Sequence, residues 1–158
     1  MNHETPQLHL ENQLCFPLYA ASRLMTKMYA PLLKELDVTY PQYLVLLVLW
    51  QNGEQTVNAI GTCLLLESNT LTPLLKRLEQ KELLVRSRAQ HDERVVLVKL
   101  TPSGQALKEK AVSIPQQIAN LFSDVDLKEE DYSTFEKTLA QLVPVSYTHL
   151  TLPTKRIV

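Results

Sequence analysis

Cys15 is the residue of this sequence with the widest chemical range, because a thiol that ionises can act as a nucleophile or be oxidised. The apolar spacing that follows it predicts a first helix, and the dipole of a helix favours a thiolate in its early turns. Tyr19 comes one turn later, at i+4, within reach on the same helix face. The alternative is that Cys15 is inert packing, since cysteine is among the most often buried residue types.

A second chemically useful set lies in the segment SNTLTPLLKRLEQKEL, which begins at Ser68. Its leucines recur at helical spacing and predict an inward face, which leaves a polar face free. From Ser68 to Lys99 there are seven basic and four acidic residues, a net charge of +3 within a chain of net charge -1. Such a local basic segment is typical of phosphate contact, although lysines and arginines on a solvated face give the same count. The polar residues able to meet base edges and phosphates are Ser68, Asn69, Thr70, Thr72, Lys76 and Arg77.

The elements that must position these residues are mostly helices. The apolar stripe from Leu14 to Leu32 predicts a first helix, divided at Pro31 because an interior proline removes a hydrogen bond. Thr39 precedes YPQYLVLLVLW, which is apolar almost all round and is expected to be the buried centre. Thr56 and Ser68 are expected to cap the next two helices.

After these helices the periodicity changes to that of strands. LLVRSRA and VVLVKL flank the polar tip QHDER and predict a β-hairpin. A further helix is expected from Thr101 to about Phe122, with a break at Pro115, and a last one from Asp126, with Glu129 completing a capping box. The fold class is therefore mainly α with a small β-hairpin wing, the layout of a winged helix-turn-helix.

Four segments carry a family resemblance: LENQLCFPLYAASR, TYPQYLVLLVLW, ESNTLTPLLKRLEQKELLVRSR and HDERVVLVKLT. They resemble the MarR family of winged-helix regulators and, within it, the OhrR branch that senses organic hydroperoxides. The resemblance implies a homodimer that binds double-stranded operator DNA and releases it on oxidation. The implied regions are an N-terminal dimerisation region with the sensing thiol at 1–36, the winged helix-turn-helix at 37–101, C-terminal dimerisation helices at 102–143, and an irregular tail at 144–158, either foreign or native.

The resemblance also gives the residues around the thiol their roles. Cys15 is then the redox-sensing residue, and Tyr19, Tyr29 and Tyr40 support its thiolate, largely across the dimer interface. No cysteine follows Cys63, which matches members that complete the switch with a low-molecular-weight thiol. Cys63 itself is expected in the core.

Organic peroxide chemistry also needs access to the thiol and an apolar lining. Phe16, Leu18 and Met25 would supply that lining, or pack as core or dimer contacts.

In the wing, the resemblance implies that Arg94 enters the minor groove and that Asp92 holds it in place. An arginine there meets strong negative potential, which makes this contact a reading of DNA shape. Arg86 and Arg88 lie two residues apart, on one face of the first wing strand, and are expected to contact phosphates or to remain solvated.

Several function classes are disfavoured by the sequence. At 158 residues the chain is the size of one domain, and without a membrane span or signal sequence the cytoplasm is the expected location. Its scattered histidines indicate no metal site, no cofactor is expected, and a thiol peroxidase or other enzyme is disfavoured. A MarR regulator controlled by a phenolic ligand, with a structural Cys15, and a winged helix that binds protein only remain as alternatives.

Overall fold

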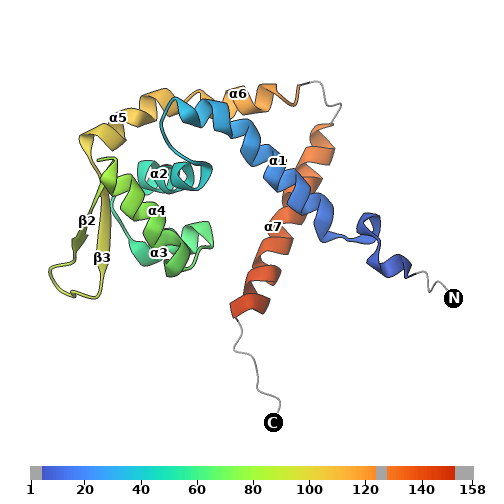
Figure 1. Cartoon of the computed structure of the whole chain (residues 1–158), viewed down its shortest axis with the longest axis horizontal. Coiled ribbons are helices and arrows are strands. Elements are labelled where there is room, and N and C mark those ends of the chain that lie inside the picture. The colour runs from blue at the N-terminus through green and yellow to red at the C-terminus, as the bar shows by residue number, and fades with distance from the viewer. Residues whose placement is uncertain (1–4, 124–127, 152–158) are drawn as a thin grey trace, which may run out of the picture. The chain divides into compact units, whose positions relative to one another are not determined.

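The computed structural model describes residues 5–123 and 128–151, and the chain divides into two compact units, Met1–Ile118 and Ala119–Val158. Figure 1 shows the elements in chain order. They are η1 (Pro6–Leu8), η2 (Leu10–Asn12), α1 (Cys15–Lys34), α2 (Tyr40–Asn52), β1 (Gln55–Thr56), α3 (Val57–Leu64), α4 (Ser68–Gln80), β2 (Leu84–Arg88), β3 (Val96–Leu100), α5 (Pro102–Ala111), α6 (Ile114–Asn120) and, in the second unit, α7 (Glu129–Thr151).

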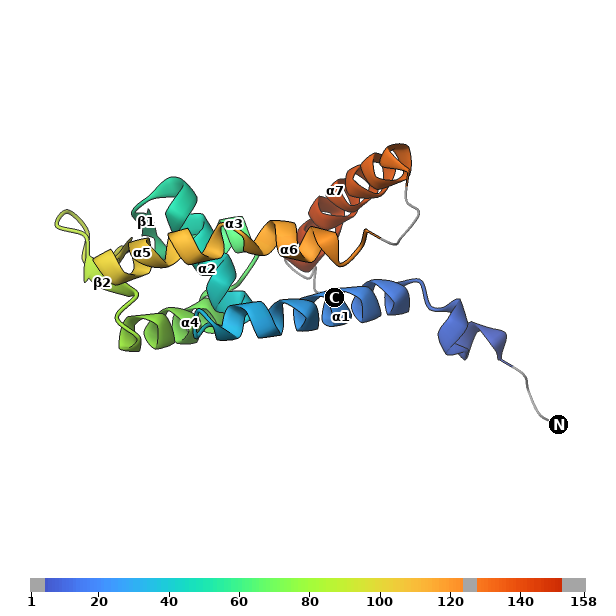
Figure 2. The same ribbon diagram turned by 90° about the horizontal axis from the view of Figure 1, so that it is seen from above.

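The predicted hairpin is present and belongs to a small antiparallel sheet with the strand order β1-β3-β2. Arg86 of β2 pairs with Val98 of β3, and Val98 pairs in turn with Gln55 of β1. β1 was not expected, because a two-residue strand leaves no periodic pattern. The hairpin projects from the helices in both ribbon views (Figures 1 and 2), and β2 is an edge strand of the sheet.

The core of the first unit lies where α2, α3 and α4 meet the sheet. The expectation that the 40–50 segment is the buried centre is confirmed, since Val45, Leu46 and Leu49 have almost no exposed surface. The inward face of α4 is confirmed in the same way by Leu71, Leu75 and Leu78. This packing fixes the orientation of α4, so its other side faces solvent.

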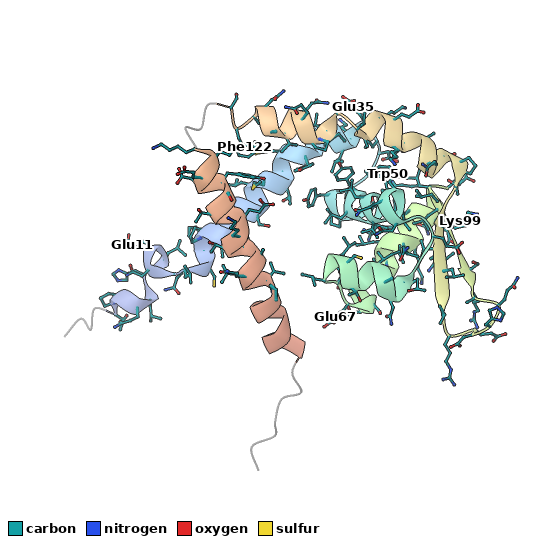
Figure 3. The ribbon with its side chains drawn as sticks, turned by 180° about the vertical axis from the view of Figure 1, so that it is seen from behind. Glu11, Glu35, Trp50, Glu67, Lys99 and Phe122 are labelled. Carbon is teal, nitrogen blue, oxygen red and sulfur yellow. The ribbon has the colours of Figure 1, made fainter. Side chains whose placement is uncertain are left out.

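α5 is joined to the rest of this unit by a side-chain hydrogen bond and by a close backbone approach, both at Gly104. The indole Nε1 of Trp50 on α2 donates a hydrogen bond of 2.9 Å to the carbonyl of Gly104 on α5. A Cβ built on Gly104 would lie 1.9 Å from the carbonyl oxygen of Leu83, so only glycine fits there. Figure 3 shows Trp50 on the side of α2 that faces α5.

The expected cap at Thr56 is confirmed, and the helix expected to begin at Thr101 is capped by that residue. The hydroxyl of Thr56 accepts from the Ala59 N–H at 3.0 Å, and that of Thr101 accepts from the Gly104 N–H at 3.0 Å. α4 differs, because its N-cap is Glu67 and Ser68 is already its first helical residue. Small polar residues are common both at the N-cap and at the first position of a helix, so the sequence could not fix the start of α4 to one residue.

Two expected interruptions are wrong, and one is confirmed. α1 continues through Pro31 to Lys34, because a proline costs one helical hydrogen bond while buried Leu33 anchors the last turn. α7 likewise continues through Pro144 to Thr151, so the tail is not irregular over 144–151. The break near Pro115 is confirmed, since α5 ends at Ala111 and α6 begins at Ile114. Asp126 and residues 152–158 lie outside the described residues.

Replacing Thr56 by alanine is expected to lower the free energy of unfolding by about 1 kcal/mol, because the Ala59 N–H loses its cap. Denaturant-induced unfolding followed by circular dichroism measures this change. Thr62→Ala is the matched control, because Thr62 is exposed on the same helix and its hydroxyl only donates back to the Asn58 carbonyl. An equal loss in both variants would contradict the capping role.

Candidate thiol site and nucleic-acid interface

Cys15 is the first residue of α1, and its side chain is exposed. The apolar residues around it are exposed as well, with Leu14 at 81%, Phe16 at 41% and Leu18 at 40% of their full accessible surface. This first half of α1 extends away from α2, α3 and α4 in both ribbon views (Figures 1 and 2). The thiol is therefore accessible, and it sits in an apolar surface.

The expected supporting tyrosines do not gather around the thiol of their own chain. Tyr19 lies one turn from Cys15 and is exposed, with the guanidinium of Arg23 5.9 Å from its ring centroid. Tyr29 lies fourteen residues from Cys15 on the same continuous helix, which corresponds to about 21 Å at the rise of an α-helix. Tyr40 packs against Tyr29, with ring centroids 4.8 Å apart. Tyr29 and Tyr40 thus form a pair remote from the Cys15 of the same chain.

The tyrosine pair extends into a larger aromatic group that the sequence analysis missed. Tyr43 lies 6.2 Å from Tyr29 and 6.2 Å from Trp50, measured between ring centroids. The spacing of Tyr40 and Tyr43, one helical turn apart on α2, could have indicated this aromatic group. Burial raises the pKa of Tyr40, and the nearby Tyr29 raises it further. Burial raises the pKa of Tyr43 as well, with Tyr29 and Tyr40 adding to the effect. Both phenols therefore stay protonated, as hydrogen-bond donors, to a higher pH than free tyrosine.

The polar face of α4 lies where the sequence places it. Ser68, Asn69 and Thr70 are exposed in the first turn, and Thr72 is half-buried. Lys76 and Arg77 are exposed further along. Because the leucines of the opposite face are buried, this face is free to enter a groove of DNA.

At the wing tip, Asp92 contacts Arg94 through the backbone and not through the guanidinium. Its carboxylate accepts a hydrogen bond of 2.9 Å from the backbone N–H of Arg94, so it shapes the turn and does not bind the guanidinium. The side chain of Arg94 is left exposed. Arg88 is exposed too, with one guanidinium nitrogen 3.7 Å from a carboxylate oxygen of Glu93.

A hollow of about 410 Å³ lies between the starts of α3 and α4 and the wing. It brings together residues of both predicted DNA-contacting segments, which are 14 or more positions apart in the sequence. They are Ser68 and Thr72 of the helix and Arg86 and Arg94 of the wing. The arrangement offers hydroxyls and guanidinium groups to a single anionic ligand surface.

Arg86 is held by a residue of α4 that the sequence analysis did not single out. The carboxylate of Glu79 accepts from the Arg86 backbone N–H at 2.9 Å, from Nε at 2.9 Å and from Nη2 at 2.6 Å. The side-chain hydrogen bond with Arg86 lowers the pKa of Glu79, against a smaller opposing effect of burial. Arg86 therefore does not point its whole guanidinium at solvent, and the pair fastens β2 to α4.

The lowered pKa of Glu79 predicts a pH dependence of stability. The stabilisation by the pair is complete above the unfolded glutamate pKa of about 4.5 and is lost as the pH falls through the lower folded value. We therefore expect the free energy of unfolding to fall more steeply between about pH 6 and about pH 3 in the parent than in Glu79→Gln. Urea unfolding across this range measures the difference, and parallel curves would contradict the prediction.

Cys63 is exposed on α3, so its expected place in the core is wrong. The inward side of α3 is formed by Ile60 and Gly61. Cys63 follows Gly61 by two residues, or about 200° around the helix, so it lies beside Ile60 at the edge of the inward side and away from Gly61. Its apolar neighbours in the sequence concealed this orientation.

The described residues hold neither a metal-binding cluster nor a membrane-spanning helix. No group of three or more histidine, cysteine, aspartate or glutamate side chains is arranged there to hold a metal ion. None of the described helices is both long and apolar enough to cross a membrane.

Comparisons with known proteins agree with this geometry. Residues 27–111 match the family described as Transcriptional regulator SarA/Rot. The organic hydroperoxide resistance transcriptional regulator of Bacillus subtilis strain 168 is 54% identical over 131 residues, which cover 82% of this chain and 89% of that protein. The chain belongs to the MarR family of transcriptional regulators. This membership confirms the expected OhrR-type resemblance.

Solved structures of similar MarR-family proteins share the fold. Reduced AbfR bound to DNA has a TM-score of 0.71 at 41% identity, covering 89% of this chain and 96% of that one. Disulfide-formed AbfR has a TM-score of 0.60 at 41% identity, covering 87% and 95%. AbfR comes from Staphylococcus epidermidis. This MarR-family chain is thus a DNA-binding transcriptional regulator with a winged helix.

Proposed function

We propose that this MarR-family chain is a cytoplasmic repressor that binds operator DNA as a homodimer and releases it when an organic hydroperoxide oxidises Cys15. The observation that carries the proposal is the exposed thiol at the first residue of α1. The similarity to a hydroperoxide resistance regulator and to DNA-bound AbfR supports the same function.

The geometry of α1 supports the proposed homodimer. Tyr29 and Tyr40 are too far from their own Cys15 to reach it, because about 21 Å of straight helix lies between. Pairing the exposed first half of α1 with a second copy would bring the tyrosine pair of one subunit to the Cys15 of the other. The same pairing would cover Leu14, Phe16 and Leu18, which are exposed in the single chain.

The proposed oxidation consumes one hydroperoxide per thiol. The Cys15 thiolate attacks one peroxide oxygen, the O–O bond breaks, and the organic fragment leaves as an alkoxide that takes a proton to become an alcohol. The product is a sulfenic acid, which condenses with a low-molecular-weight thiol to a mixed disulfide and water. Tyr19 of α1, with Tyr29 and Tyr40, would donate hydrogen bonds that stabilise the attacking thiolate.

DNA binding is assigned to α4 and the wing. The polar face of α4 would lie in the major groove, and Arg94 in the adjacent minor groove. The residues proposed to contact DNA directly are Ser68, Asn69, Thr70, Thr72, Lys76, Arg77, Arg88 and Arg94, with Asp92 shaping the wing tip and Arg86 at its base. In a symmetric dimer the two half-sites would be one helical turn of DNA apart.

Binding of the reduced protein to DNA from upstream of its own gene tests the proposal. We expect binding to weaken steeply with salt and to be lost after about one equivalent of cumene hydroperoxide plus a small thiol, then restored by reductant. If the DNA affinity depends on salt but does not change after hydroperoxide treatment, the protein is a DNA-binding regulator without this redox switch.

A phenolic effector is the second candidate function, and one feature favours it. A largely apolar hollow of about 430 Å³ between α2 and the α5–α6 segment is lined by Tyr43, Leu47, Trp50 and Pro115, among others. Aromatic walls of this kind suit a planar aromatic acid. Salicylate that releases DNA from the fully reduced protein would support this candidate, and release that requires oxidant would exclude it.

A further inference from the structure

The contact between Glu79 and Arg86 joins the two segments that are assigned to DNA. Glu79 lies in the last turn of α4, and Arg86 is the third residue of β2, the strand that leads to the wing tip. Both side chains are partly buried, at 34% and 24% of their full exposure, so the pair is shielded from solvent on one side. Its three hydrogen bonds involve a carboxylate, which makes them stronger than bonds between neutral groups.

The backbone bond of the pair matters as much as the side-chain bonds. In the strand order β1-β3-β2, β2 has β3 on one side and no strand on the other, within the described residues. The Arg86 N–H donates to Glu79, so it points out of the sheet at this free edge. Glu79 therefore accepts the hydrogen bond of an edge N–H group that would otherwise be free to pair with another strand. It fixes the strand itself as well as the arginine side chain.

A small rotation at this point has a large effect at the wing tip. The tip lies five to six residues beyond Arg86, or about 18 Å at the rise of an extended strand. A rotation of about 10° at the base would move the tip by about 3 Å, on the same extended-strand estimate. This displacement is larger than the range of distances that a hydrogen bond tolerates. Arg94 would then no longer reach DNA together with the polar face of α4.

We propose that Glu79 is a positioning residue for DNA recognition, which sets the wing relative to α4 so that Arg94 and the polar face of α4 reach DNA together. The inference rests on the proposed contact of Arg94 with the minor groove. Glu79 itself touches no DNA in this assignment and acts through Arg86.

The sign of the affinity change distinguishes positioning from a simple charge effect. Removing a negative charge next to DNA strengthens binding through the phosphates, and it would also free the Arg86 guanidinium. Glu79→Gln is nevertheless expected to weaken binding about 5- to 50-fold, because the wing loses its orientation. Glu82→Gln removes the same charge three residues away, from an exposed side chain, and is expected to leave binding unchanged or slightly stronger.

The experiment measures the affinity of the reduced full-length protein for a duplex that the wild type selects from a random pool. Glu79→Gln is measured alone and together with Arg94→Ala. Arg94→Ala alone is expected to weaken binding about 5- to 100-fold. In that background Glu79→Gln should change the affinity less than about twofold, because the misplaced contact is already absent.

Glu79→Asp gives a second measurement that keeps the charge. Its side chain is one methylene shorter, so the bonds to Arg86 are lost or lengthened, and binding should weaken as in Glu79→Gln. Thermal unfolding confirms that each variant is folded at the temperature of the binding assay.

Four outcomes overturn the inference. If Glu79→Gln strengthens binding, the residue acts only through its charge, and if it weakens binding equally with and without Arg94, its role is structural. If Glu79→Gln has no effect while Arg94→Ala weakens binding, this inference fails and the proposed wing contact stands. No effect of Arg94→Ala would overturn the wing contact and the inference together.

Discussion

Cys15→Ser is expected to bind DNA as tightly as the wild type and to lose the response to organic hydroperoxide entirely. Serine has nearly the size of cysteine, and the side chain at this position is exposed in the single chain, so the fold should not change. The wild type should lose about 5- to 150-fold in DNA affinity on oxidation, the range of coupling between two sites in one protein. Fluorescence anisotropy of labelled duplex DNA, before and after cumene hydroperoxide, measures both proteins.

Cys63→Ser is the matched control for this prediction, because Cys63 is also an exposed thiol. It should respond to hydroperoxide like the wild type. If Cys63→Ser loses the response and Cys15→Ser keeps it, the sensing thiol lies on α3. If both variants keep it, neither thiol is the trigger.

Gly104→Ala is expected to destabilise the protein by about 3 kcal/mol or more, since overpacking against rigid backbone is costly. The added Cβ would lie 1.9 Å from the carbonyl oxygen of Leu83, and no side-chain rotation can relieve a contact between two backbone segments. Moving α5 away would also lengthen the hydrogen bond from Trp50 to the Gly104 carbonyl. The change appears as a lower midpoint in thermal or denaturant unfolding.

Gly53→Ala separates this steric effect from the general cost of losing a glycine. A Cβ there meets nothing within 4 Å, but the residue has a φ of 70° in a region that favours glycine. Its expected cost is about 1 to 2 kcal/mol from backbone strain alone. A smaller loss in Gly104→Ala than in Gly53→Ala would show that α5 can shift freely.

Features of the fold that depend on neighbouring residues could be predicted from the sequence. The caps at Thr56 and Thr101 and the β2–β3 hairpin follow from side chains within a few positions of each other. The polar face of α4 follows from the spacing of its leucines. In each case the residues that give the prediction are the same neighbouring residues that form the feature in the structure.

Features that depend on distant partners could not be predicted. The continuation of α1 through Pro31 depends on the burial of Leu33, and the exposure of Cys63 depends on how α3 packs. Glu79 looks like an ordinary exposed residue of an amphipathic helix until the register of β2 places Arg86 beside it. The pairing of Tyr29 with Tyr40 likewise depends on how α1 packs against α2.

Trp50 makes the joint between α2 and α5 visible by optical spectroscopy. It is the single tryptophan of the sequence, so all indole emission comes from this one position. Its Nε1 is bonded to the Gly104 carbonyl, and the ring of Tyr43 lies 6.2 Å away between centroids. Movement of α5 against α2 would therefore break or lengthen this hydrogen bond and shift the emission wavelength. The unlabelled protein can thus report the timing of such a movement in a stopped-flow fluorimeter.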